Sequence, residues 1–139
     1  MYVLDTNVIS ELRKKELGKA DLQVVKWADS APPETRYISS ITIMEIEMGI
    51  LSLERRTNQQ SDNLRNWLRN QVLVAFRDRI LPVDEGVALR CAQIMTPRTR
   101  PLRDALIAAT AQHHGYTVVT RNVKDFIELP VRLLNPWES

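Results

Sequence analysis

The first apolar segment of the chain ends abruptly in polar residues. Residues 2–4 (Tyr-Val-Leu) are followed at once by Asp5, Thr6 and Asn7. A short apolar run of this kind is typical of a buried strand. In a parallel α/β sheet, ligands bind just beyond the carboxyl ends of the strands. The segment therefore predicts a β-strand at the start of the chain and makes Asp5 a candidate functional residue.

The rest of the chain alternates between short apolar runs and segments with helical spacing. Further strands are predicted at 37–39, 79–83, 117–119 and 131–134, and helices at 8–12, 21–30, 42–53, 64–76, 87–95 and 102–114. Strands separated by helices need crossover connections, which make neighbouring strands parallel. The pattern predicts a three-layer α/β/α fold around a central parallel sheet of four or five strands.

Composition narrows the class of protein further. The 139 residues, 44% hydrophobic and 26% charged, predict a single globular domain spanning 1–139. A lone cysteine, Cys91, excludes an internal disulfide and a cysteine-rich zinc site, so a reducing, cytoplasmic location is expected. No apolar stretch approaches the ~18 residues of a membrane span. The net charge of +2 is compatible with a nucleic-acid partner without requiring one.

Four acidic residues occupy similar places in this predicted fold. Asp5 follows the first strand, Glu45 and Asp104 lie in the first turns of predicted helices, and Asp125 follows the fourth strand. Strand C-termini and helix N-termini meet at one edge of a parallel sheet, so these acids are expected to gather there. Two carboxylates ~4 Å apart repel by about 4 kcal/mol, and such a cluster must take up protons or bind cations. Oxygen ligands favour a hard divalent ion, Mg²⁺ or Mn²⁺.

Each acid also has a purely structural interpretation. Asp5 fits the N-cap of a helix beginning near Thr6. Glu45 lies three residues after Thr42, the spacing of a capping box. Asp104 would interact favourably with a helix macrodipole, and Asp125 could be a turn residue. Considered separately, these interpretations compete with catalysis; the joint placement of the acids at one edge favours a metal site.

Four segments of the sequence together resemble a known family. They are 4–7 (LDTN), 40–45 (SITIME), 103–111 (RDALIAATA) and 119–126 (VTRNVKDF), in that order. In sequence and spacing they resemble the PIN domain, and in particular the VapC toxins of the FitB type. The likeness extends from Met1 to the Asn-Pro-Trp ending at 135–137.

The resemblance implies a magnesium-dependent endoribonuclease, the toxin of a bacterial type II toxin-antitoxin system. It also implies a homodimer inhibited by a small VapB/FitA-like antitoxin, although no apolar stripe in the sequence marks a dimer surface. Asp5, Glu45 and Asp104 match the three principal acids of the family. Some relatives carry a fourth acid where this chain has Asn122, so either Asp125 supplies the fourth carboxylate or Asn122 acts as a neutral ligand.

The resemblance also assigns supporting roles near the acids. Thr6 and Thr120 match small hydroxyl positions that orient the acids or a bound water, and Asn7 and Asn122 lie beside them in the same motifs.

A basic cluster precedes the Asp104 motif. Arg98, Arg100 and Arg103 are candidate RNA contacts that would guide phosphates toward the acids. The alternative is a solvated basic loop.

Two other functions fit parts of the sequence. The first is a catalytically inactive PIN-like module that binds RNA or protein. The intact set of acids argues against this function. The second is a phosphatase with Asp5 as the nucleophile. Such enzymes typically carry a second aspartate two positions later, where this chain has Asn7.

Overall fold

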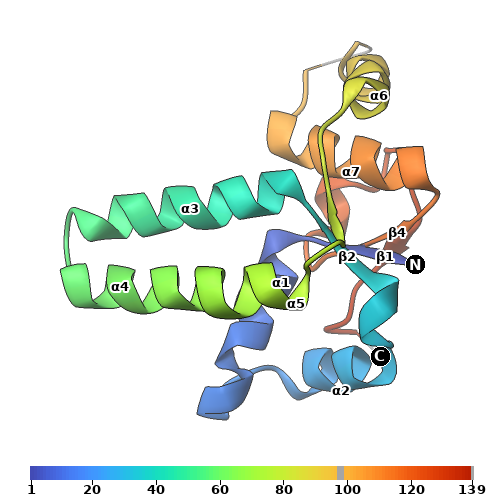
Figure 1. The fold of residues 1–139 in the computed structure, drawn as a ribbon. Coiled ribbons are helices and arrows are strands. Elements are labelled where there is room, and N and C mark those ends of the chain that lie inside the picture. The colour runs from blue at the N-terminus through green and yellow to red at the C-terminus, as the bar shows by residue number, and fades with distance from the viewer. Residues whose placement is uncertain (97–98, 139) are drawn as a thin grey trace.

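The structure, a computed structural model, describes residues 1–96 and 99–138, and a parallel sheet lies at its centre (Figure 1). Within these residues, five strands pair in parallel in the order β3-β2-β1-β4-β5. The strands are β1 (Tyr2–Leu4), β2 (Arg36–Ser39), β3 (Ile80–Leu81), β4 (Thr117–Val119) and β5 (Leu133–Leu134). The predicted parallel α/β/α fold is confirmed.

Helices connect the strands and cover both faces of the sheet. They are α1 (Thr6–Arg13), α2 (Leu22–Ser30), α3 (Ser40–Glu54), α4 (Asn58–Trp67), α5 (Leu73–Ala75), α6 (Glu85–Met95) and α7 (Leu102–His114), with short turns η1 (Lys14–Leu17), η2 (Pro33–Thr35), η3 (Leu68–Val72) and η4 (Val123–Asp125). Helices α3 and α4 form a hairpin that extends away from the sheet (Figure 1). Across the described part of the chain, no helix has both the length and the apolar character needed to cross a bilayer.

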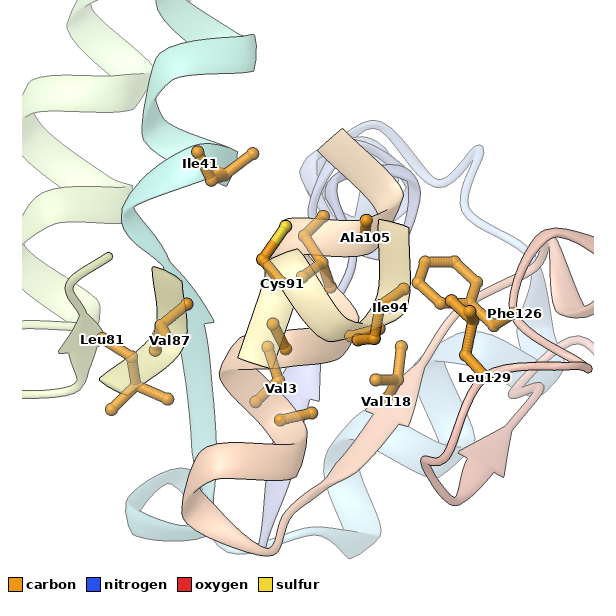
Figure 2. Close-up of a cluster of buried hydrophobic side chains, with 14 residues drawn as sticks. Val3, Ile41, Leu81, Val87, Cys91, Ile94, Ala105, Val118, Phe126 and Leu129 are labelled. Atoms are coloured by element: carbon orange, nitrogen blue, oxygen red, sulfur yellow. The ribbon is translucent and has the colours of Figure 1, made fainter. Parts of the chain in front are cut away.

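Successive residues of the central strands face opposite sides of the sheet. Val3 and Val118 pack with Ile107 of α7 and Phe126 in one buried cluster (Figure 2). The residues that follow them, Leu4 and Val119, belong to a second cluster with side chains of α1, α3 and η3. Because side chains alternate along a strand, one continuous apolar run fills the core on both faces.

Several element boundaries differ from those predicted. Helix α3 begins at Ser40, before the predicted residue 42, because the Ser39 hydroxyl accepts a hydrogen bond from the Ile41 amide at 3.0 Å and caps the helix. Strand β3 ends before Pro82, whose nitrogen cannot donate to a neighbouring strand. The helical segment predicted at 64–76 starts earlier, at Asn58, and is interrupted by the π-helical turn η3.

Helices α6 and α7 pack closely against each other. Asp84 caps α6, and its carboxylate accepts a hydrogen bond from the Val87 amide at 3.0 Å. Helix α7 has the predicted bounds and ends at Gly115, whose φ of 72° is a left-handed conformation that glycine adopts readily. The His113 ring lies so close to Gly86 that a Cβ there would come within 2.4 Å of its Cε1 atom.

Candidate active site

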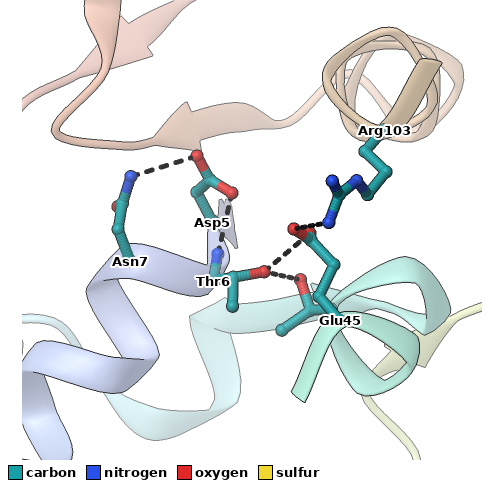
Figure 3. Close-up of polar contacts among 6 residues, drawn as sticks. Asp5, Thr6, Asn7, Glu45 and Arg103 are labelled. Carbon is teal, nitrogen blue, oxygen red and sulfur yellow. Dashed lines mark hydrogen bonds and ion pairs between the residues drawn. The ribbon is translucent and has the colours of Figure 1, made fainter. Parts of the chain in front are cut away.

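Asp5 links the sheet to the first helix. Its backbone amide donates to the Val119 carbonyl of β4 at 2.9 Å, while its carbonyl accepts from the Val8 amide of α1 at 3.0 Å. Its Oδ1 atom accepts from the Thr6 amide at 2.8 Å, so Asp5 is the N-cap of α1 (Figure 3). Its other oxygen, Oδ2, accepts from the Thr120 hydroxyl, also at 2.8 Å. The capping role and the predicted site position therefore coincide in one residue.

The surroundings of Asp5 disfavour its charge. The residue is only 6% exposed. Burial raises the pKa of Asp5, the hydrogen bonds from Thr120 and Thr6 oppose that rise, and the charges of Glu45 and Asp125 add to it. A bound cation would relieve this cost.

Glu45 reaches the same place from α3. Its Oε1 atom accepts a hydrogen bond from the Thr6 hydroxyl at 2.9 Å, and its Oε2 atom lies 3.3 Å from Nη1 of Arg103 (Figure 3). The predicted first-turn position and capping box are wrong, because the Ser39 cap starts α3 at Ser40 and places Glu45 in the second turn. Thr42 is buried, with its hydroxyl 3.3 Å from that of Thr6.

Asp104 lies in the first turn of α7, as predicted. Its pKa is raised to about 6, first by burial and then by the charges of Asp5, Asp125 and Glu45, while Arg103 opposes the rise. These mutual effects mean that the fold brings the four acids near one another.

The segment after β4 contains both candidates for the fourth position. Asp125 is exposed at the end of η4, and its charge raises the pKa of Asp5 and of Asp104. Asn122 is exposed, and its backbone amide donates to the Thr120 hydroxyl at 3.0 Å. The charge of Asp125 thus acts on Asp5 and Asp104. Asn122 instead supports the site through the hydrogen bond from its backbone amide to Thr120.

Small polar side chains connect these segments. The side-chain nitrogen Nδ2 of Asn7 lies 3.4 Å from both Oδ2 of Asp5 and the Thr120 hydroxyl. The Oδ1 atom of Asn7 accepts a hydrogen bond from the Arg121 backbone amide at 3.3 Å. Thr6 and Thr120 each donate to an acid, the kind of role that the family resemblance implies. Sequence reasoning misses Thr42 as a residue of the site, because its spacing to Glu45 is that of a capping box.

The three arginines predicted to contact RNA have different surroundings. Arg98 lies outside the described residues. Arg100 forms an ion pair with Glu128 at 3.6 Å, and Arg103 forms the ion pair with Glu45. Of the two that the structure describes, Arg103 reaches the acids.

The donor set matches the chemistry of a hard divalent cation. Carboxylate oxygens come from Asp5, Glu45 and Asp104, and burial makes the unneutralised charges of Asp5 and Asp104 costly. In residues 1–96 and 99–138, no three acid, histidine or cysteine side chains already form a metal-binding group. Carboxylate oxygens are the ligands that Mg²⁺ takes, usually one or two of them together with several waters.

The fold is a parallel α/β/α domain whose acids gather at the carboxyl edge of the sheet. Residues 2–131 match the family model of the PIN domain. The chain belongs to the PIN-domain family.

Within that family, its relatives include named toxins and ribonucleases. VapC ribonuclease Y4jK of Sinorhizobium fredii is 38% identical over 99% of each chain. Toxin FitB of Neisseria gonorrhoeae is 37% identical over 100% of each chain, and the crystal structure of FitAcB from that organism has a TM-score of 0.89 with full coverage of both chains. A toxin-antitoxin complex from Klebsiella pneumoniae has a TM-score of 0.71 at 27% identity, again covering 100% of each chain.

Proposed function

We propose that this chain is a magnesium-dependent endoribonuclease and the toxin of a toxin-antitoxin pair. One observation carries the proposal: Asp5, Glu45 and Asp104 come from separate segments, lie close together, and include two carboxyls whose pKa is raised by burial and by repulsion between the acids. A cluster of this kind stabilises a bound cation. The names of the relatives, a VapC ribonuclease and the toxin FitB, support RNA as the substrate and a toxic role.

Some of the side chains would hold the cation, and others hold those side chains in place. Asp5 and Asp104 would bind Mg²⁺ (or Mn²⁺) directly, and Glu45 and Asp125 would complete its shell through water. The bound ion would supply an activated water and stabilise the charge that develops on the phosphodiester. The Thr120 hydroxyl fixes Oδ2 of Asp5, and one of the carboxylates would accept the proton of the attacking water.

Cleavage of RNA by antitoxin-free protein tests the proposal. We expect a mixed pool of structured and single-stranded RNAs to be cut with Mg²⁺ and left intact with EDTA. Asp5→Asn and Asp104→Asn should lower the rate at least a hundredfold, whereas Asp29→Asn, in an exposed ion pair with Lys15, should cut normally. The products should carry a 5′-phosphate, and a 2′,3′-cyclic phosphate would contradict metal-activated water as the nucleophile.

The alternative function is an inactive PIN-like module. If folded, metal-loaded protein bound RNA or a protein partner and cut nothing, this alternative would replace the ribonuclease proposal.

A groove next to α1 supports docking of an antitoxin. It is lined by apolar side chains, among them Ile9, Leu12 and Phe76, and by basic side chains that include Arg13 and Arg36. We propose that an amphipathic antitoxin segment with acidic side chains binds here, because apolar and basic groups would both find partners. The Klebsiella pneumoniae relative was solved as a toxin-antitoxin complex. Leu12→Glu should abolish co-purification with the antitoxin, and its thermal midpoint checks that the variant is folded.

An exposed apolar stripe on α3 supports the expected homodimer. Met44, Met48 and Leu51 are 42%, 51% and 52% exposed and lie on one face of the helix, at spacings of four and three residues. We propose that a second copy of the chain covers this stripe. Met48→Glu should convert a dimer to a monomer in light scattering.

A further inference from the structure

Among the described residues, Arg103 is a cation that the fold places against the acidic cluster. It comes from the first turn of α7, and its Nη1 atom lies 3.3 Å from Oε2 of Glu45 on α3 (Figure 3). The Arg103 side chain is 55% exposed, whereas that of Glu45 is 20% exposed. The guanidinium therefore approaches Glu45 from the solvent side of the cluster.

Both oxygens of Glu45 are engaged. The Thr6 hydroxyl donates to Oε1 at 2.9 Å, and Arg103 neutralises Oε2. Arg103 also opposes the rise in the pKa of Asp104 that burial and the neighbouring acids cause. One guanidinium thus compensates part of the negative charge that a bound cation would otherwise neutralise.

We propose that Arg103 is a resident counter-cation, which holds Glu45 in the absence of a divalent ion, opposes the binding of that ion beside the carboxylate, and is released to bind an RNA phosphate. This inference rests on the proposed ribonuclease function. A guanidinium and a divalent cation repel each other when both lie against one carboxylate. An exposed ion pair is weak enough to be displaced, and its released arginine suits the bidentate recognition of phosphate.

Metal binding without RNA tests this opposition directly. We expect Arg103→Met to bind Mn²⁺ about two- to fivefold more tightly than the unmodified chain in calorimetric titrations, because an exposed ion pair is worth about that factor. The affinity of Arg103→Lys for Mn²⁺ should lie between those of Arg103→Met and the unmodified chain, because lysine keeps the charge but lacks the planar guanidinium.

A matched control separates the loss of this pair from the loss of any ion pair. Arg65→Met breaks the pair between Arg65 and Glu54, whose nitrogen and oxygen lie 2.6 Å apart. Glu54 is nine residues beyond Glu45, or about 13 Å further along α3. Arg65→Met should bind Mn²⁺ as tightly as the unmodified chain. Thermal midpoints in EDTA check that every variant is folded.

The released guanidinium predicts a second effect, on RNA. Arg103→Met should raise KM for RNA about three- to tenfold and leave kcat within twofold, because the lost contact is to phosphate rather than to reacting atoms. An unchanged KM would overturn the phosphate contact.

The outcomes distinguish this inference from the proposed function. Equal or weaker Mn²⁺ binding by Arg103→Met would overturn the opposition to metal binding and make the pair a scaffold that positions Glu45. If the unmodified chain bound Mn²⁺ and cut no RNA, the ribonuclease proposal would fail while tighter binding by Arg103→Met still supported the counter-cation. If the unmodified chain bound no Mn²⁺ at millimolar concentration, the counter-cation would be refuted as well.

Discussion

The charge of Asp104 is costly to the folded chain when no cation is bound. Its pKa is raised from an ordinary 3.8 to about 6, first by burial and then by Asp5, Asp125 and Glu45. Replacing it with asparagine keeps the size of the side chain and removes the charge. We therefore expect Asp104→Asn to stabilise the metal-free protein at neutral pH.

The shift in pKa sets the size of this gain. If solvent screening is ignored, a rise in pKa from 3.8 to about 6 corresponds to a cost of about 3 kcal/mol in folding free energy. Because Asp104 is only partly buried, solvent screening reduces the expected gain to about 1 kcal/mol.

The direction of the pH dependence follows from proton linkage. Below pH 3.8 the carboxyl is protonated in both the folded and the unfolded chain, so its charge costs nothing. As the pH rises from 3.8 to about 6, the folded chain holds the proton longer than the unfolded chain, and stability falls. The advantage of Asp104→Asn should therefore be full above about pH 6 and disappear as the pH falls toward 4.

Urea unfolding in EDTA, at pH 7.5 and pH 4.5, measures both the size and the pH dependence. Asp29→Asn is the control, since that exposed acid pairs with Lys15 and its loss should change stability by less than about 0.5 kcal/mol. The reasoning would be refuted if Asp104→Asn were no more stable at pH 7.5, or if its advantage were as large at pH 4.5.

Other substitutions test the support of the site and the packing of the helices. Thr120→Val removes the hydroxyl that donates to buried Asp5 and should lower the free energy of unfolding by about 1–3 kcal/mol in urea titrations; no change would mean that water replaces the hydroxyl. Gly86→Ala places a methyl group against the exposed His113 ring, which must turn aside, so the gain that alanine usually gives in a helix should be lost. Gly49→Ala, in open space within α3, should stabilise by about 0.5–1 kcal/mol, and equal stability of the two glycine variants would contradict the packing argument.

The sheet and the meeting of the acids could be predicted because both depend on local pattern and on general topology. Residues 2–4 and 117–119 are apolar runs ended by polar residues, and parallel pairing places those ends at one edge. The position of Asp5 follows from that rule, as does that of Asp104 in the first turn of α7.

The contacts within the site could not be predicted, because they depend on side chains from distant segments. Glu45 and Arg103 are 58 residues apart, and nothing in the local sequence of either indicates their ion pair. The Thr42-x-x-Glu45 spacing even pointed to a cap, because Ser39 and Thr42 are both good capping residues and the choice between them decides the turn in which Glu45 lies. The exposure of Asp125 likewise depends on how η4 turns away from β4.

The direct junction between β1 and α1 has a consequence for amide hydrogen exchange. Asp5 donates its backbone amide to β4, accepts from α1 through its carbonyl, and holds the Thr6 amide with its side chain. No loop separates the sheet from the helix at this point, so the Asp5 amide, which donates to the Val119 carbonyl, cannot exchange with solvent through a local loop opening. Its exchange should follow the unfolding of the whole core, as for the amides of β4. The geometry around Asp5 is then as long-lived as the fold itself.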